Sequence, residues 1–574
     1  MLKPYINVIV PYIYVLMNII FFATNEIVKW APSMLFTIPK KGNLKFVTNW
    51  RGIQMCEFIC AWYDRILCNR INLWMNLDEF QTAYQKGKGC NTQIFTFRVI
   101  TELAKRMKRP VYISYVDLEK AFDQVRRSTM LRVLASLGIG SVMLSAIKNL
   151  YSVTKVFLNG VGEFVSTSGI RQGASSSVYI FVIFINGLFS YLRNIFPSSD
   201  IFGSIHCLIH ADDTLILGDD LEDLKDKVLC TYNFFNEIDQ KVNMGKSKYM
   251  CLDNSTIERN RDSICINGQL VGYTAKEKYL GHHITDDNLL RTSIDCDIAE
   301  RSSEVLVKYR NFINNNASAT IQIRLKVFQA CFSNSILSNC EVWGHYFPKK
   351  LCTLYNKGLR LALGVRASTP TVLIFLESRQ PCVKALVIKR QLKFWQSLAK
   401  GEGSEMLKLL TSAKNTLYIK HYLKLENMYE TPEIAFEALN KTFYDDAIHS
   451  VMNCKNEQTK LKTYKNIYDL HNIHSLPVIS FTLSAENEYR RFILTRYIVS
   501  SSNLMAVIGR WSGDNKTCAK CQRNEEETLE HFIFMCDAYS DIRNQTTFPT
   551  NLNSFFKWNQ CGYVLEQFYK LRGN

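Results

Sequence analysis

The pattern of apolar and polar positions predicts a mixed core between residues 111 and 252. Apolar runs that are bounded by turn residues are typical of strands and hairpins, and they occupy residues 111–118, 155–165 and 206–218. Runs with the spacing of helices occupy residues 121–138 and 176–192, and the second is apolar enough to be largely buried. Alternating strands and helices of this kind indicate an α+β core.

The flanking parts of the chain have a helical pattern. The first 110 residues look helical, apart from a basic loop at residues 39–53, and residues after about 290 are mainly helical with Lys and Arg on periodic faces. From Asn515 the chain changes to short polar turns with paired cysteines. The apolar segment Tyr5–Ala23 is interrupted by Pro11 and two asparagines, so we expect a buried helix or two short helices there and no membrane span.

Composition points to an intracellular protein of several domains with a polyanionic partner. A chain of 574 residues exceeds one ordinary core. Its net charge of +17 and pI near 9.0 favour nucleic acid over a membrane surface. The 18 cysteines are mostly single and no signal peptide precedes them, which favours a reducing compartment, the nucleus or the cytoplasm, over a secreted disulfide scaffold.

Two adjacent carboxylates lie in the apolar run 209–217, "IHADDTLIL". Asp212 and Asp213 would occupy the tight turn of a hairpin, and Asp117 ends the strand-like run before it. If that strand pairs with the hairpin in an antiparallel sheet, the three carboxylates share one site, which only cations can stabilise. Mg²⁺ prefers such oxygen ligands, and two ions roughly 4 Å apart suit in-line displacement at phosphorus. The sequence therefore predicts a site that binds two Mg²⁺ ions.

Several motifs occur in the order and spacing found in reverse transcriptases, and the chain most resembles the enzymes of non-LTR (LINE-type) retrotransposons. These motifs are "NWRGI", "QTAYQKGKGCNTQIF", "VDLEKAFDQV", "GIRQGASSSVYIFVIFINGL", "HADD", "NMGKSKYM" and "YLG". The resemblance continues downstream through "VFQACFSNSILSNCEVWG" and "LRLALGVRASTP". Any one motif is weak evidence, whereas seven in order are highly specific.

The resemblance implies the right-hand polymerase fold: an α+β architecture with an antiparallel-sheet palm, a helical thumb and C-terminal extension, and a small zinc knuckle. The expected parts are fingers at 1–110, palm with the remaining fingers at 111–290, helical thumb at 291–400, a helical C-terminal region at 401–510 and the zinc-knuckle region at 511–574.

The resemblance also implies roles for residues around the expected metals. Asp117 and Asp212 match the principal Mg²⁺-binding aspartates, with Asp213 beside them and Mn²⁺ as a substitute ion. Lys246 matches the lysine that protonates pyrophosphate, although Lys248 is the alternative.

A second set of residues would bind the incoming nucleotide and the template. Phe122 matches the aromatic gate that excludes a 2′-hydroxyl. Gln172 and Gly173 match the loop that supports the templating pair, where glycine allows close approach to a nucleotide. Lys41 and Arg51 resemble the grip on the triphosphate, and a merely solvated surface is the alternative for both, as for Lys86 and Lys88.

The sequence departs from the family in two places. His210 replaces the usual aromatic before Ala-Asp-Asp, and Ala174–Ser177 replace the usual Pro-Leu-Ser. We expect His210 to keep a flat ring but to add a titratable charge near the metals. Loss of the proline is expected to loosen the loop. Neither change removes a carboxylate, so we expect an intact site.

A Cys/His cluster near the end of the chain has the spacing C-x2-C-x9-H-x4-C. It consists of Cys518, Cys521, His531 and Cys536. These types and spacings predict a tetrahedral Zn²⁺ site that is structural, because four protein ligands leave no open position. The cluster resembles the C-terminal zinc knuckle of many non-LTR polymerases, and it would organise a small surface for nucleic acid or, given the acidic run "RNEEETLE", for protein.

The implied activity is RNA-templated addition of deoxynucleotides to a DNA 3′-hydroxyl. The partners are then an RNA template, a DNA primer or target and deoxynucleoside triphosphates. The fingers begin almost at Met1 and 38 residues follow Cys536, so we expect no endonuclease in this chain. It is then either a fragment of an element or a polymerase that needs a nick made by a separate endonuclease. The alternative is a captured, inactive nucleic-acid-binding protein, which has no physical reason to keep all three aspartates.

Overall fold

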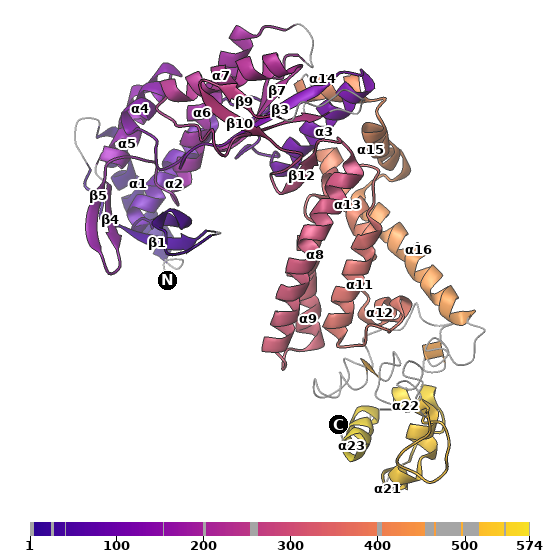
Figure 1. Ribbon diagram of the computed structural model, residues 1–574. Helices are drawn as coiled ribbons and strands as arrows, with labels where there is room; N and C mark the ends of the chain where they lie inside the picture. The colour runs from indigo at the N-terminus through magenta and orange to yellow at the C-terminus, as the bar shows by residue number, and fades with distance from the viewer. Residues whose placement is uncertain are drawn as a thin grey trace. The chain divides into compact units, whose positions relative to one another are not determined.

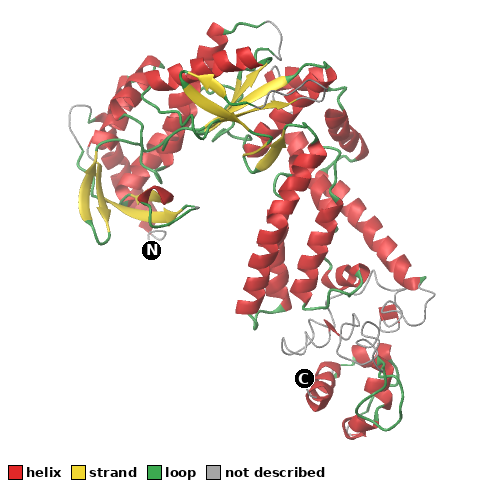
Figure 2. Cartoon of the chain, in the orientation of Figure 1, coloured by secondary structure: helices red, strands yellow, loops and turns green. Residues whose placement is uncertain are grey.

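The chain divides into two compact units, and each is described by itself. Unit 1 comprises residues 1–289 and 397–420, and unit 2 comprises residues 290–396 and 421–574. The structure is a computed structural model, shown by chain position in Figure 1 and by secondary structure in Figure 2. It describes residues 5–23, 28–40, 42–152, 154–198, 203–252, 262–398, 405–453, 464–465, 495–496, 516–544, 547–558 and 560–572. The five-part division expected from the sequence stays a prediction.

A six-stranded sheet forms the centre of unit 1. Its strand order is β6 (Cys207–His210), β7 (Asp213–Gly218), β3 (Val111–Val116), β8 (Lys248–Leu252), β10 (Gln269–Tyr273) and β9 (Ile264–Ile266). Every neighbouring pair is antiparallel except β8 and β10, which are parallel. The sheet confirms the predicted strand and the hairpin at residues 206–218. The predicted pairing of the first strand with that hairpin is also confirmed.

Helices cover this sheet because its strands are apolar along most of their length. Unit 1 contains α2 (Phe58–Trp74), α3 (Cys90–Arg106), α6 (Ser175–Ile195), α7 (Leu221–Glu237) and α14 (Glu405–Ala413). The predicted buried helix is confirmed as α6, which packs against α2 and α7. Among the described residues, α6 is the one helix long and apolar enough to cross a bilayer, but 61% of its most apolar window is buried inside the protein. Its apolar character is therefore explained by the core.

A smaller sheet lies in the same unit, with strand order β2-β1-β4-β5. It contains β1 (Ser33–Pro39), β2 (Trp50–Met55), β4 (Thr154–Leu158) and β5 (Gly162–Ser166), and β1 and β4 pair in parallel. The hairpin predicted at residues 155–165 is confirmed by β4 and β5. Helices α4 (Arg127–Ser136) and α5 (Ser141–Ser152) precede it, and strands β11 (Lys276–Tyr279) and β12 (His282–Thr285) form a separate pair.

The helix predicted at residues 121–138 begins later, at Arg127. Residues 119–124 form turns and a bend instead, and Lys120 has a φ of 45°, in the left-handed region. Side chains around these turns line the cavity described below, so the local helical spacing gives way to the shape of the site.

The predicted burial of the N-terminal apolar segment was wrong. It forms one helix, α1 (Ile6–Phe22), with Pro11 inside it. Only Met17 and Ile20 on this helix are buried, whereas Tyr12 and Ile19 are 75% and 64% exposed. Only a narrow stripe of α1 is buried against the rest of the protein. The other faces of the helix are exposed although they are apolar.

Unit 2 is helical, as the sequence predicts. Its helices are α8 (Leu290–Asn315), α9 (Ile321–Val327), the π-helix η3 (Phe328–Ser333), α10 (Asn334–Ile336), η4 (Cys340–Val342), α11 (Lys349–Leu363), α12 (Thr371–Ser378), α13 (Val383–Leu398), α15 (Leu417–Met428) and α16 (Pro432–Met452). The last two residues of α13 and the first four of α15 belong to unit 1. The first four residues of the predicted C-terminal helical region and most of residues 454–510 lie outside the described residues.

The C-terminal segment of unit 2 packs on its helices. It contains η6 (His531–Met535), η7 (Asp537–Tyr539), α21 (Ser540–Asn544), α22 (Leu552–Lys557) and α23 (Cys561–Arg572). Phe532 and Phe568 belong to the same buried cluster as Leu376 of α12 and Val451 of α16. One core therefore joins this segment to α12 and α16.

Gly358 on α11 provides a test of packing in unit 2. A Cβ at this position would lie 2.5 Å from Cε1 of Phe332 and 2.7 Å from Cε2 of Phe328, both on η3. Alanine favours a helix by about 1 kcal/mol over glycine, but overpacking of this kind costs about 1–3 kcal/mol. We expect Gly358→Ala to lower the midpoint of thermal unfolding. Gly140→Ala, where no heavy atom lies within 4 Å, is the control and should leave the midpoint nearly unchanged. An equal midpoint for both variants would contradict this packing.

Candidate active site and metal centre

Three carboxylates meet where β3 and β7 begin or end. Val116 pairs with Thr214, and the same antiparallel register continued by one residue sets Asp117 opposite Asp213. Asp212 is in the two-residue turn between His210 and Asp213, and this turn requires a φ of 56° at Ala211. The hairpin is thus held tightly enough to keep the two neighbouring aspartates beside Asp117.

Mutual repulsion and partial removal from water change the acidity of this group. The pKa of Asp213 is raised to about 6 by desolvation first and then by the charges of Asp212 and Asp117. Desolvation also raises the pKa of Asp117, with Lys246 acting in the opposite direction. Carboxylates that resist ionisation in this way are stabilised by a bound cation. The residues present therefore fit divalent metal ions.

Residues 241–247 fix the backbone around Asp117. Asn243 donates its backbone N–H to the carbonyl of Asp117 at 2.7 Å, and Glu119 donates to the carbonyl of Lys241 at 2.9 Å. The Nζ atom of Lys246 lies 3.9 Å from Oδ2 of Asp117. Lys246 lines the adjoining cavity, whereas Lys248 belongs to β8 and is not among the described lining residues. This geometry favours Lys246 over Lys248 for a role near the carboxylates.

A cavity of about 810 Å³ opens beside the carboxylates. Its described lining includes the predicted residues Arg51, Asp117, Phe122, Gln172, Gly173, Asp212 and Lys246. Asp213 is outside that lining, and Lys41 lies outside the described residues, although its neighbour Lys40 lines the cavity. The structure thus brings most of the predicted set together, while the role of each residue stays a prediction.

Phe122 is half-buried in the cavity wall. Its ring stacks on Phe181 of α6, with 4.4 Å between centroids. Since Phe181 is fully buried, the inner face of Phe122 is supported by the core. An aromatic side chain held in this way can act as a rigid wall for a ligand.

Gln172 and Gly173 are held against β2. The carbonyl of Gln172 accepts a hydrogen bond from Gln54 N at 2.6 Å, and its side chain donates to Oδ1 of Asp123 at 2.7 Å. Gly173 has a φ of 117°, and a Cβ there would lie 2.6 Å from the carbonyl oxygen of Gln54. The sequence analysis attributed this glycine to the approach of a nucleotide. The structure shows that the close approach of β2 already requires a glycine at position 173.

Two buried charged residues that the sequence analysis missed support this loop. Asp64 of α2 accepts hydrogen bonds from the backbone N–H groups of Ser175 and Ser176, at 2.5 and 3.2 Å, and from the Ser176 hydroxyl. It therefore caps the N-terminus of α6 from another helix. The other residue, Arg171, is 3% exposed and lines the cavity. Their roles in supporting this loop could not be predicted, because a single Asp or Arg among apolar residues forms no recognisable pattern in the sequence.

The expected loosening of residues 174–177 is compensated by these contacts, since Asp64 binds Ser175 and Ser176 directly. The charge expected at His210 stays a prediction. Burial lowers the pKa of His210, and the charge of Asp212 opposes this effect. Its two nitrogens lie 2.9 Å from Oγ1 of Thr82 and 3.3 Å from Sγ of Cys90, which suits a neutral imidazole.

Lys88 has a local role and is not one of the described residues that line the cavity. Its Nζ donates to the carbonyl of Glu79 at 2.8 Å, and burial lowers its pKa. Lys86 is exposed on the surface. Neither position supports a direct contact with a ligand in the cavity.

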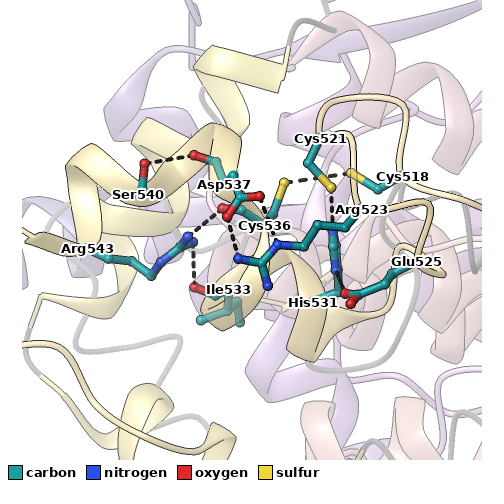
Figure 3. Close-up of polar contacts among 10 residues, drawn as sticks. All are labelled: Cys518, Cys521, Arg523, Glu525, His531, Ile533, Cys536, Asp537, Ser540 and Arg543. Carbon is teal, nitrogen blue, oxygen red and sulfur yellow. Dashed lines mark hydrogen bonds and ion pairs between the residues drawn. The ribbon is translucent and has the colours of Figure 1, made fainter.

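The four residues of the C-terminal cluster converge as predicted (Figure 3). Their candidate ligand atoms all lie within 4.8 Å of one another. Sγ of Cys518 is 3.7 Å from Sγ of Cys536, and Sγ of Cys521 is 3.4 Å from Nε2 of His531. Three of the four residues are buried. The group can hold one metal ion through three sulfurs and one nitrogen.

Outer contacts orient these ligands. Glu525 accepts a hydrogen bond from Nδ1 of His531 at 2.9 Å, which leaves Nε2 directed at the sulfurs. Arg523 donates to both carboxylate oxygens of Asp537, at 2.8 and 2.5 Å, next to Cys536. A carboxylate on the far nitrogen of a histidine is typical of metal sites, because it fixes the tautomer and strengthens the ligand.

Comparison with known proteins agrees with this geometry. Residues 38–284 match the family described as "Reverse transcriptase (RNA-dependent DNA polymerase)". The Pol polyprotein of retrotransposable element R2 from Popillia japonica is 25% identical over 266 residues, which cover 44% of this chain and 37% of that protein. The R2DM polyprotein of Drosophila melanogaster is 24% identical over 213 residues, 36% of this chain and 20% of that protein. The chain thus spans 37% or less of the length of these relatives.

A telomerase structure from Candida albicans is also similar, with a TM-score of 0.40 and 12% identity over 73% of this chain and 67% of that chain. The fold assignment rests on the family match and on the sheet and carboxylate geometry, not on this likeness. The family match and this geometry confirm the predicted right-hand polymerase class and the predicted resemblance to reverse transcriptases. Residues 38–284 therefore match the reverse transcriptase family, and relatives of this chain include the Pol polyproteins of R2-type non-LTR retrotransposons.

Proposed function

We propose that this chain is an RNA-directed DNA polymerase that extends a DNA 3′-hydroxyl on an RNA template. The observation that carries the proposal is the convergence of Asp117, Asp212 and Asp213 beside a large cavity with an aromatic wall. The reverse transcriptase match over residues 38–284 supports the same chemistry. Since the chain covers only part of its relatives, the activity of the whole protein remains our proposal.

Asp117 and Asp212, with Asp213, would hold two Mg²⁺ ions, for which Mn²⁺ substitutes. Bound there, the ions would activate the attacking hydroxyl and neutralise charge on the leaving pyrophosphate. Asp117 is held in place by backbone hydrogen bonds from residues 241–247, so its carboxylate needs little reorganisation. The ammonium of Lys246 lies 3.9 Å from Asp117 and would give a proton to the departing pyrophosphate.

The remaining cavity residues would bind the nucleotide and template. Arg51 of β2 lines the cavity and would bind phosphate oxygens, together with Lys41. Phe122 would pack against the sugar and exclude a 2′-hydroxyl, since Phe181 prevents it from moving inward. Gln172 and Gly173 would support the templating base pair. The partners follow as an RNA template, a DNA primer or target, deoxynucleoside triphosphates and a separate endonuclease, and we propose an intracellular location.

The C-terminal cluster would hold one structural Zn²⁺. Tetrahedral Zn²⁺ with bonds of about 2.3 Å to sulfur and 2.0 Å to nitrogen implies separations of about 3.8 Å between sulfurs and about 3.5 Å between sulfur and nitrogen. The observed separations of 3.7 and 3.4 Å are close to these values. The cluster lies in a common core with α12 and α16, so the ion would stabilise this part of unit 2.

Asp212→Asn tests the catalytic proposal. We expect primer extension on poly(A) RNA with Mg²⁺ to be lost, because one metal ligand is removed. RNA binding should stay within a few-fold, because the basic surface is unchanged. Asp226→Asn, an exposed carboxylate on α7, is the matched control and should extend normally. Retained extension by the Asp212 variant would exclude the metal assignment. Absence of extension by the parent protein would favour the alternative function, an inactive nucleic-acid-binding protein.

Phe122→Val tests the sugar gate. We expect selectivity for a deoxynucleotide over its ribonucleotide, measured as the ratio of kcat/KM, to fall on the order of tenfold or more. Phe181→Leu changes the ring behind Phe122 and serves as the packing control, which should slow both substrates alike. Equal selectivity in the parent and Phe122→Val would mean that Phe122 serves only the core.

Glu525→Gln tests the metal centre. One Zn²⁺ per chain should copurify with the parent protein and be lost in Cys518→Ser and His531→Ala. Glu525→Gln should keep the ligands but weaken zinc retention by about 10- to 100-fold, because His531 loses its orienting carboxylate. Glu526→Gln, the adjacent exposed carboxylate, is the control. Competition with a chelator, followed by atomic emission, measures retention. Full zinc content in Cys518→Ser would reduce the cluster to ordinary cysteines.

A further inference from the structure

A second group of reactive side chains lies behind the cavity, where α2 faces the loop at residues 171–176. Cys56, Cys60 and Asp64 are spaced by four residues each, so they share one face of α2 and the turn before it. Asp64 binds the start of α6, as described above. The two cysteines instead contact Arg171, the residue before Gln172 and Gly173.

Both sulfurs bind the same guanidinium. Nη1 of Arg171 lies 3.2 Å from Sγ of Cys60 and 3.6 Å from Sγ of Cys56. Its Nη2 donates to the carbonyl of Leu150, and its Cζ is 5.5 Å from the centre of the Tyr151 ring. A buried guanidinium requires a nearby negative charge, since an uncompensated buried cation is strongly destabilising. Next to Nη1 of Arg171, the sulfurs of Cys56 and Cys60 are the groups that can supply this negative charge.

The two thiols differ in accessibility and in proton affinity. Cys60 is buried, whereas Cys56 is partly exposed. A hydrogen bond from Cys60, assisted by the charge of Arg171 and opposed by burial and by Asp64, lowers the pKa of Cys56 to about 6. The same hydrogen bond and burial raise the pKa of Cys60. Cys56 is then an accessible thiolate, and Cys60 is the thiol that donates to it.

We propose that Cys56 and Cys60 form an oxidation site at which hydrogen peroxide produces a disulfide, frees Arg171 from its sulfur partners and thereby lowers nucleotide addition. The part about nucleotide addition rests on the proposed polymerase function. The oxidation itself does not, because it depends only on the two sulfurs and the guanidinium.

The chemistry balances with one peroxide per pair. The Cys56 thiolate attacks one peroxide oxygen, the O–O bond breaks, and the leaving hydroxide takes up a proton to form water. Cys56 is then a sulfenic acid. The sulfur of Cys60 attacks the Cys56 sulfur, the S–O bond breaks, and hydroxide leaves with the proton of Cys60 as a second water. Two thiols are oxidised and one peroxide is reduced to two waters.

Oxidation would change the support of the cavity loop. A disulfide carries no charge and accepts hydrogen bonds weakly, so Arg171 would be left buried without its counter-charge. The carbonyl of Gln172 and the backbone at Gly173 are fitted against β2 with little free space. Movement of Arg171 is therefore transmitted directly to the residues proposed to support the templating pair.

Alkylation of the reduced full-length protein tests the thiolate. At pH 6.5 a thiol with a pKa near 6 is mostly ionised, but its lower intrinsic nucleophilicity offsets part of the gain, so iodoacetamide should modify Cys56 roughly fivefold to tenfold faster than an ordinary thiol. Peptide mass spectrometry measures both rates in one sample. Cys265 and Cys331, which are exposed, are the internal references. Equal rates at pH 6.5 would overturn the thiolate.

Peroxide treatment tests the disulfide and its effect. The mass of the peptide that contains both Cys56 and Cys60 should fall by two hydrogens, and dithiothreitol should restore the original mass. Cys60→Ser keeps a hydrogen-bond donor, so Cys56 should still alkylate rapidly but form no disulfide. Primer extension should fall several-fold in the parent protein on oxidation and stay higher in Cys56→Ser. Equal inhibition of the parent protein and Cys56→Ser by peroxide would overturn the proposed effect of the disulfide on the loop at residues 171–176. Absence of extension in the reduced protein would refute the proposed function but not the oxidation site.

Discussion

Electrostatic repulsion among three carboxylates is the constraint that shapes unit 1. Asp117, Asp212 and Asp213 are kept together by an antiparallel register and a two-residue turn that forces Ala211 into the left-handed region. Desolvation is the largest cause of the raised pKa values of Asp117 and Asp213, and repulsion from neighbouring carboxylates adds to it. The sheet is stable because β3 is a central strand, bonded to β7 on one side and β8 on the other.

The loops around the carboxylates are fixed by contacts from distant parts of the chain. Asn243 binds the backbone of Asp117, Gln54 binds Gln172, and Asp64 caps α6 next to the cavity. Each contact satisfies a backbone group that would otherwise be unpaired beside the site. Preorganisation here therefore comes from backbone hydrogen bonds, and the ligand-facing side chains are left free for chemistry. The replacement of the usual Pro-Leu-Ser by Ala174–Ser177 is tolerated for the same reason, because Asp64 holds the loop without proline.

The sequence predicted those features that depend on local pattern. The strands at residues 111–118 and 206–218, the buried helix at 176–192 and the convergence of Cys518 with His531 were all confirmed. Features that depend on tertiary contacts were missed. Asp64 and Arg171 gave no periodic signal, and α1 is exposed although its composition favours burial. Burial lowers the pKa of His210, and its neighbours Thr82 and Cys90 could not be inferred from its position in the chain.

The two candidate metal sites differ in how exposed their residues are, and this difference follows from their chemistry. Asp117, Asp212 and Asp213 are exposed to solvent at the edge of a cavity, which leaves room for substrate oxygens in the coordination sphere. Cys518, His531 and Cys536 are buried, and Glu525 occupies the free nitrogen of the histidine, so the C-terminal cluster is closed. Ligand number and burial therefore separate a group suited to catalysis from one suited to holding a fold.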